Sequence, residues 1–129
     1  MSKPKITIVD DDRDTRELLA EALGAEGFEV MSAANGLRLV ASLELHRPHA
    51  ILLDVNMSWI NGFELCQAVK QNKQFRDIPI IFISGRGDPE DKRRGMEVGA
   101  ADYFVKPLEL DALVNRIREL IPADVAKEP

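Results

Sequence analysis

Cysteine, excess positive charge and long apolar runs are all scarce in this sequence, and each absence excludes a class of protein. The single cysteine, Cys66, rules out an internal disulfide and suits a reducing cytoplasm. The 22 acidic side chains outnumber the 17 basic ones, so the basic surface typical of nucleic-acid binding is missing. No apolar run approaches the roughly 18–20 residues of a membrane helix, and we expect neither a signal peptide nor a membrane contact. These absences together predict a cytoplasmic protein.

The rest of the composition is that of one globular domain. The chain has 129 residues, of which 45% are apolar and 30% charged, enough for a core and a solvated surface. We expect this domain to span residues 1–121, with residues 122–129 as a tail or the start of a linker. Cys66 has no partner at metal-ligand spacing and is interpreted as a small buried side chain in a helix. His46 and His49 are interpreted as loop residues, because Pro48 breaks any helical face that they could share.

Short β-branched runs alternate with longer amphipathic segments five times along the chain. The expected strands are Ile6–Val9, Phe28–Ala33, Ala50–Asp54, Ile78–Ser84 and Asp102–Val105. Several of them are continuously apolar, as strands are when helices cover both faces of a parallel sheet. Helical spacing joins Leu18, Leu19, Ala22 and Leu23; Leu37, Val40 and Leu43–Leu45; Phe63, Leu65, Cys66 and Val69; and Leu110, Leu113, Ile117 and Leu120. This alternation predicts an α/β fold, a doubly wound five-stranded parallel sheet with five helices.

The fourth expected helix has the clearest boundaries. Asp88 can cap its first turn, and Pro89 at the first helical position has no N–H to leave unpaired. Glu90 and Asp91 favour the positive end of the helix dipole, and Gly99 is expected to end the helix.

Chemically active residues follow four of the five expected strands. Asp10-Asp11-Asp12 follows the first strand, Asp54 ends the third, Ser84 ends the fourth, and Lys106-Pro107 follows the fifth. Because ligands bind at the carboxyl edge of such sheets, these side chains should converge there. Crowded carboxylates repel one another unless a cation is present, and Mg²⁺ prefers such oxygen ligands. A carboxylate can also attack phosphorus, so the pattern indicates phosphoryl transfer to an aspartate.

Five segments in this order resemble the receiver domains of two-component response regulators. They are Ile8–Asp12, Leu52–Met57, Asn61–Leu65, Pro79–Gly85 and Gly99–Pro107. The resemblance covers about Lys5 to Leu120 and implies strand order 2-1-3-4-5. It also implies a role in a phosphorelay: a sensor histidine kinase or a histidine phosphotransfer protein donates the phosphoryl group. A downstream protein or output domain then responds, with phosphorylation-dependent homodimerisation as one option and no direct contact of this domain with nucleic acid.

The resemblance implies a phosphoacceptor and a metal site. Asp54 matches the phosphoacceptor. Asp11 matches the direct Mg²⁺ ligand, and Asp10 matches its neighbour, which usually acts through a water. The backbone carbonyl of Asn56 matches the position that completes the metal shell, and Mn²⁺ is an expected substitute for Mg²⁺. A domain of this kind modifies itself and is not a turnover enzyme.

The resemblance also implies a switch. Ser84 matches the switch hydroxyl, Lys106 the lysine that contacts a phosphoryl oxygen, and Tyr103 the aromatic ring that turns from solvent inward. The responding face would be built from the fourth helix, the fifth strand and the fifth helix. One segment departs from the family pattern: Met57–Gly62 lacks the usual proline and places Trp59 where glycine is common. Trp59 is interpreted as a partner anchor, a lid on the site, or a side chain packed on the third helix.

Three alternatives fit these residues less well. A phosphatase of the haloacid dehalogenase type would carry its nucleophile in an Asp-x-Asp motif after the first strand. Here the candidate nucleophile follows the third strand, in Asp54-Val55-Asn56, and the chain is too short for a cap domain. A flavodoxin-like flavin carrier would have a Ser/Thr/Gly-rich phosphate loop where this chain has three aspartates. A degenerate receiver used only for docking would not need Asp10, Asp11, Asp54, Ser84 and Lys106 together.

Overall fold

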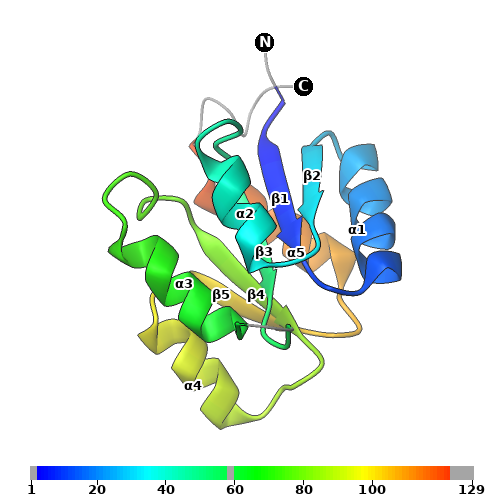
Figure 1. The fold of residues 1–129 in the computed structure, drawn as a ribbon. Helices are drawn as coiled ribbons and strands as arrows, with labels where there is room; N and C mark the ends of the chain where they lie inside the picture. Colours follow the sequence, from blue (N-terminus) through cyan, green and yellow to red (C-terminus); the bar gives the residue numbers. More distant parts are fainter. Residues whose placement is uncertain (1–2, 58–59, 123–129) are drawn as a thin grey trace.

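Strands and helices alternate along the whole described chain (Figure 1). The structure is a computed structural model that describes residues 3–57 and 60–122. The elements are β1 (Lys5–Val9), α1 (Arg13–Ala25), β2 (Glu29–Ala33), α2 (Gly36–Leu43), β3 (Ala50–Asp54), α3 (Gly62–Gln71), β4 (Ile80–Ser84), α4 (Pro89–Glu97), β5 (Asp102–Val105) and α5 (Leu110–Leu120). The five expected strands are confirmed, with shifts of one or two residues at the starts of β1, β2 and β4.

The strands form one parallel sheet in the order β2-β1-β3-β4-β5, as predicted. The register places Val9 beside Leu53, Asp54 beside Ile83, and Ser84 beside Val105. The last residues of β1, β3, β4 and β5 therefore lie within one residue of the end of the neighbouring strand. The segments that follow these strands start from the same edge of the sheet.

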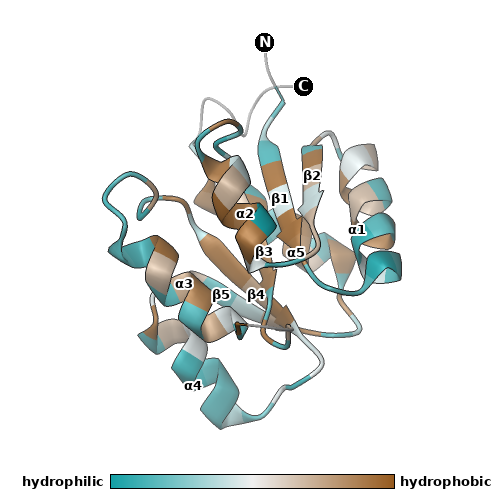
Figure 2. Cartoon of the chain, in the orientation of Figure 1, coloured by the Kyte–Doolittle hydropathy of each residue, from teal (hydrophilic) through white to brown (hydrophobic). Residues whose placement is uncertain are grey.

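Helices cover both faces of the sheet, which explains why its central strands are apolar throughout (Figure 2). Alternate residues of each strand enter opposite cores, because successive side chains of a strand point to opposite faces. Helices α1 and α5 close one core, in which Ile6, Ile8, Leu52, Ile81 and Ile83 lie. Residues of α2 and α3 close the other, in which Val9, Ile51, Leu53, Ile80 and Phe82 lie.

Polar side chains cap the starts of four helices at the carboxyl edge of the sheet. Asp12, Asn35, Asn61 and Asp88 each accept a hydrogen bond from a backbone N–H three residues later. The cap expected at Asp88 is thereby confirmed. Gly99 follows the end of α4 with φ of 102°, a left-handed conformation that glycine adopts without steric cost, so the expected end is confirmed as well.

The apolar stripes expected on the first two helices are partly wrong. Leu18, Leu37 and Leu45 are 69%, 79% and 80% exposed, and Val40 is also exposed. The buried line of α1 runs through Leu19 and Leu23, and that of α2 through Leu39 and Leu43. A side chain one position from such a line lies about 100° around the helix and misses the sheet.

The smaller interpretations about single residues are confirmed. Cys66 is buried in α3, and its thiol contacts the carbonyl of Val98 at 3.6 Å. His46 and His49 lie in the loop before β3, where Nδ1 of His49 accepts the backbone N–H of Lys5. Within the described ranges, no helix has the length and apolar character needed to cross a membrane. Trp59 and residues 123–129 of the expected tail lie outside the described residues.

Gly62 generates a prediction about stability. A Cβ at this position would lie 2.3 Å from the backbone oxygen of Asp54, so even alanine must displace the end of β3. We expect Gly62→Ala to lower the free energy of unfolding by about 2–4 kcal/mol, measured by urea denaturation. Gly24→Ala is the matched control, because nothing lies within 4 Å of a Cβ on this helical, exposed glycine. It should be neutral or stabilising by up to about 1 kcal/mol, and equal losses in both variants would contradict the prediction.

Candidate functional site

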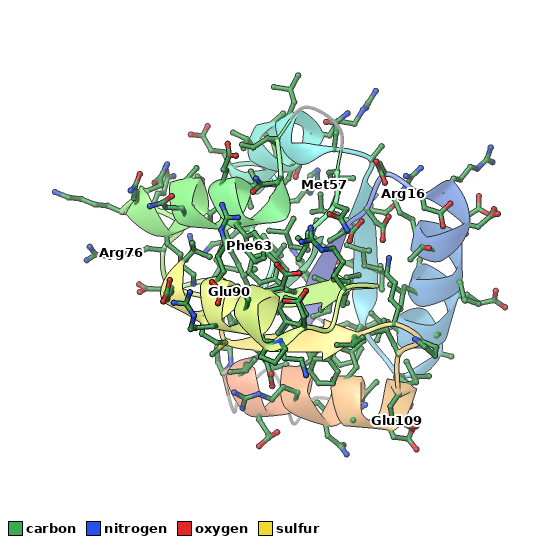
Figure 3. The ribbon with its side chains drawn as sticks, turned by 90° about the horizontal axis from the view of Figure 1, so that it is seen from below. Arg16, Met57, Phe63, Arg76, Glu90 and Glu109 are labelled. Carbon is green, nitrogen blue, oxygen red and sulfur yellow. The ribbon has the colours of Figure 1, made fainter. Side chains whose placement is uncertain are left out.

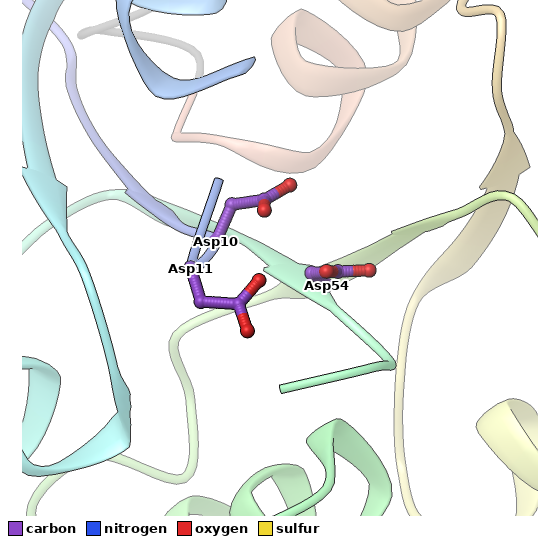
Figure 4. Close-up of side chains that lie close together, drawn as sticks. All are labelled: Asp10, Asp11 and Asp54. Atoms are coloured by element: carbon purple, nitrogen blue, oxygen red, sulfur yellow. The ribbon is translucent and has the colours of Figure 1, made fainter. Parts of the chain in front are cut away.

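Three carboxylates meet where β1 and β3 end. Asp10 and Asp11 directly follow β1, and Asp54 is the last residue of β3. One oxygen from each can be chosen so that all three lie within 4.8 Å of one another (Figure 4). Asp10 and Asp54 are 1% and 6% exposed, whereas Asp11 is exposed. The convergence expected of Asp10, Asp11 and Asp54 is thus present.

The third aspartate of the run has a different task. Asp12 is the N-cap of α1, and its Oδ2 accepts hydrogen bonds from both the N–H and the hydroxyl of Thr15. These hydrogen bonds, the hydroxyl of Thr15 first, lower the pKa of the exposed Asp12 carboxyl. The carboxylate of Asp10 is fixed by a hydrogen bond within its own loop, in which its Oδ1 accepts the N–H of Asp12 at 2.9 Å. Nη1 of Arg16 donates to the carbonyl of Asp10, which ties α1 to the end of β1.

Lys106 supplies the positive charge of the pocket. It follows β5, and its Nζ lies 3.0 Å from Oδ2 of Asp10. Its side chain is 30% exposed, so it reaches the carboxylates from the rim of the edge. Figure 3 views this edge, with Arg16 of α1, Met57 after β3 and Glu90 of α4 around it. Residues 96 positions apart in the chain are thereby joined, a contact that the sequence motifs predicted only through the topology.

The pKa of the Asp54 carboxyl lies above that of an ordinary aspartate. Burial is the main cause that raises its pKa, and the neighbouring Asp10 carboxylate raises it further, to about 6 from the ordinary 3.8. Lys106 and the N–H of Asn56, which lies 3.4 Å from Oδ1 of Asp54, act in the opposite direction. One lysine thus offsets only part of the repulsion among three carboxylates.

The donor set fits a hard divalent cation. All three groups offer carboxylate oxygens, the ligands that Mg²⁺ prefers, and the set contains neither sulfur nor imidazole. Two of the three are buried, so a cation there would relieve repulsion that water screens poorly. Asp10, Asp11 and Asp54 could therefore hold such an ion. Asn56, whose backbone carbonyl is predicted to be a further ligand, lies two residues after Asp54.

Ser84 and Tyr103 lie together on the other side of Asp54. Ser84 ends β4 and is fully buried, and its Oγ accepts the N–H of Arg86 at 3.0 Å. Tyr103 is only 9% exposed, its ring packs 6.0 Å from that of Phe82, and its hydroxyl donates to the carbonyl of Arg86. Burial raises the pKa of Tyr103, and a hydrogen bond with Ser84 opposes that rise. The expected switch pair is thus adjacent, but the ring is inside the molecule and not in the solvent-facing position from which we expected it to start.

Two residues near the site had not been singled out as site residues. The guanidinium of Arg86 contacts the side chains of Asn56 and Asp91, and Asp91 is buried in the first turn of α4. In the sequence Arg86 is one of several arginines of this region, and Asp91 reads as a favourable charge at a helix start. No spacing rule pairs them, because the loop that brings them together has no regular structure.

This sheet order with carboxylates, a hydroxyl and a lysine at the strand ends defines a flavodoxin-like receiver. The chain belongs to the response regulator receiver domain family, which it matches over residues 6–118. It is 36% identical over 121 residues to the transcriptional regulatory protein PrrA of Mycobacterium tuberculosis, covering 94% of this chain and 51% of that protein. It spans about half the length of such curated relatives.

Solved structures support the same assignment. The chemotaxis protein CheY4 of Vibrio cholerae has a TM-score of 0.86 at 32% identity, covering 93% of this chain and 100% of that chain. The signal receiver domain of a histidine kinase from Syntrophus aciditrophicus has a TM-score of 0.85 at 32% identity, covering 98% and 95%. The chain is therefore a receiver domain of two-component signalling.

The raised pKa of Asp54 predicts a pH-dependent stability. A carboxyl whose native pKa is about 6 and whose ordinary value is 3.8 stabilises the fold below about pH 4, and this contribution is lost as the pH rises through 6. With divalent cations removed by EDTA, Asp54→Asn should therefore be more stable than the wild type at about pH 7.5, by about 1–3 kcal/mol. The difference should shrink towards zero near pH 4, as measured by urea unfolding at both pH values. Glu119→Gln, an exposed change on α5, controls for the loss of a carboxylate. If the stability difference between Asp54→Asn and the wild type is the same at both pH values, the raised pKa of Asp54 is contradicted.

Proposed function

We propose that this domain accepts a phosphoryl group on Asp54 from a sensor histidine kinase or a histidine phosphotransfer protein. One observation carries the proposal: a buried carboxylate at the end of β3 lies against two further carboxylates, within a pocket that also contains Lys106. Membership of the receiver family supports phosphoacceptance in general.

Each residue has a defined part in the proposed step. An oxygen of Asp54 attacks phosphorus in line, and the bond from phosphorus to the donor nitrogen breaks, with its electron pair returning to the imidazole. Lys106 is the cation that meets a phosphoryl oxygen, leaving Asp10 as the group crosses. Ser84 offers its hydroxyl to another oxygen.

Asp10, Asp11 and Asp54, with the backbone carbonyl of Asn56, would hold Mg²⁺, and Mn²⁺ would substitute for it. When bound, the ion supplies positive charge to the phosphoryl oxygens. The modified group is the protein's own carboxylate, so the domain acts as a switch and not as a turnover enzyme. A haloacid dehalogenase-type phosphatase is disfavoured, because the candidate nucleophile lies on the third strand of the chain and not the first.

The surface beside Lys106 suits a phosphodonor. An apolar groove joins α1 to the β5–α5 loop and is lined by Leu18, Leu19, Lys106, Pro107 and Leu110, among others. A helix of a donor protein seated there would bring its phosphohistidine to the rim of the acidic pocket. We propose this groove as the docking site for the kinase or the phosphotransfer protein.

The output would pass through the face of α4, β5 and α5. Phosphorylation would draw the hydroxyl of Ser84 towards the new oxygens and bias the position of Tyr103, a two-state element moved by a local charge. Because the relatives are transcriptional regulators of about twice the length, the receiver would control an output domain or a separate partner without itself contacting nucleic acid. Homodimerisation on phosphorylation and a cytoplasmic location are further parts of the proposal.

The acceptor assignment predicts the product of a simple reaction. Wild-type protein incubated with Mg²⁺ and acetyl phosphate should gain one phosphoryl group by intact-mass spectrometry, and hydroxylamine should remove it as it removes acyl phosphates. Asp54→Asn should gain none and retain its circular-dichroism spectrum. Label that persists on Ser84 or elsewhere in Asp54→Asn would refute the assignment.

The metal assignment predicts different effects for two adjacent aspartates. Asp11→Asn removes a charged ligand and should weaken Mg²⁺ binding about tenfold or more, on the order of 1–3 kcal/mol. Asp12→Asn removes the same charge from the adjacent residue but keeps a good N-cap for α1, so the Mg²⁺ affinity of this variant should stay within about twofold of that of the wild type. Isothermal titration measures both affinities, and millimolar Mg²⁺ should raise the melting temperature of the wild type above that in EDTA. Equal losses in the two variants, or no effect of Mg²⁺ on melting, would exclude this site.

A further inference from the structure

Arg86 contacts four residues, which are Ser84, Tyr103, Asn56 and Asp91. Its N–H donates to Oγ of Ser84 at 3.0 Å, and its carbonyl accepts the hydroxyl of Tyr103 at 2.5 Å. Its guanidinium lies between Asn56 and Asp91: Nη1 is 3.3 Å from Oδ1 of Asn56, and Nε is 3.0 Å from Oδ2 of Asp91. One residue thus joins the acceptor loop, the switch pair and the first turn of α4.

Asp91 depends on this arginine. The carboxylate is 6% exposed, and Arg86 is its ion-pair partner, with Nη2 also 3.3 Å from Oδ1. Among the described residues, Oδ2 receives no hydrogen bond of acceptable geometry, despite the 3.0 Å separation from Nε. A buried carboxylate whose pairing is this incomplete is strongly destabilised when its cation leaves. If Arg86 moves, Asp91 is left as a buried charge without its ion-pair partner, and a shift of α4 would relieve this by letting water reach the carboxylate.

Arg86 is also able to move. Its side chain is 53% exposed, and it contacts Asn56, whose own N–H lies 3.4 Å from Oδ1 of Asp54. A phosphoryl group on Asp54 would present oxygens carrying more charge than one carboxylate, arranged to suit the planar fork of a guanidinium. The phosphoryl group and the Asp91 carboxylate would then compete for the guanidinium of Arg86.

We propose that Arg86 is a second cation for the phosphoryl group, besides Lys106, and that it reaches the group by leaving Asp91 and so releases α4. This inference rests on the proposed acceptor role of Asp54. It makes Arg86 the charge-sensing member of the loop, whereas Ser84 and Tyr103 respond through hydrogen bonds and packing. The two anions bind one cation in competition, so phosphoryl binding and anchoring of α4 oppose each other.

Competition predicts opposite effects for the two partners. The measured quantity is the affinity of beryllofluoride, a phosphoryl mimic, in saturating Mg²⁺, followed by NMR on the full chain. Arg86→Gln should weaken binding roughly fivefold, because it removes the contact with the mimic. Asp91→Asn should strengthen it roughly fivefold, because Arg86 no longer has to leave a carboxylate. In the double variant the gain from Asp91→Asn should vanish, and Arg86→Lys should recover part of the loss since it keeps the charge without the fork.

Arg93→Gln is the matched control. Arg93 is exposed to a similar degree, 57% against 53%, and pairs with Glu90 and Glu97 on α4 itself. Its loss should leave the affinity within about twofold of the wild type. Amide signals of residues 88–97 report α4: in Asp91→Asn they should lie nearer to their beryllofluoride-bound positions before any ligand is added.

The outcomes separate this inference from the acceptor role. Absence of binding in the wild type would refute the acceptor role and this inference with it. If the wild type binds and Asp54→Asn does not, the acceptor role holds. Changes of the same sign in Arg86→Gln and Asp91→Asn, or no change in either, would then show that the pair only shapes the loop, and the competition would be refuted.

Discussion

Two buried carboxylates at the ends of adjacent strands, Asp10 just after β1 and Asp54 at the end of β3, are held close together although each repels the other. The parallel register of β1 and β3 puts them there, and the absence of a side chain at Gly62 lets the start of α3 approach the backbone at the end of β3. Lys106 offsets part of the charge, and the rest appears as a raised pKa of Asp54. The site is consequently short of positive charge, which both a divalent ion and an electrophilic phosphorus would relieve.

The fold distributes stability unevenly around this site. Strands β3 and β4 are buried at every position, so Asp54 and Ser84 at their ends stand on a rigid base. Helix α4 is different: it is largely hydrophilic (Figure 2), and only Asp91 and Gly95 of its residues are buried. A helix with so little apolar burial is anchored by few contacts. Under the proposed function, a charge change at Asp54 would therefore act on α4 and leave the sheet in place.

Several features could be predicted from particular residues. Continuous apolar runs such as Ile80–Ile83 specify strands covered on both faces, and their alternation with amphipathic segments specifies a parallel sheet. Since parallel strands share one carboxyl edge, the sequence alone predicts a common site for Asp10, Asp54, Ser84 and Lys106. The short helices were less certain, because two turns of α2 fit more than one apolar face, and Leu37 and Val40 proved exposed.

The sequence by itself determined the elements, their parallel arrangement and the chemistry at the strand ends, because hydrophobic period and residue type are local properties. Only the tertiary structure decided how strongly the carboxylates repel, that Asp12 is a cap while Asp10 is buried, and that the ring of Tyr103 lies inside. It also decided that Arg86 pairs with Asp91 across an irregular loop. Burial and charge separation depend on distances between residues far apart in the chain, or in loops without a repeating geometry, and no local pattern encodes those distances.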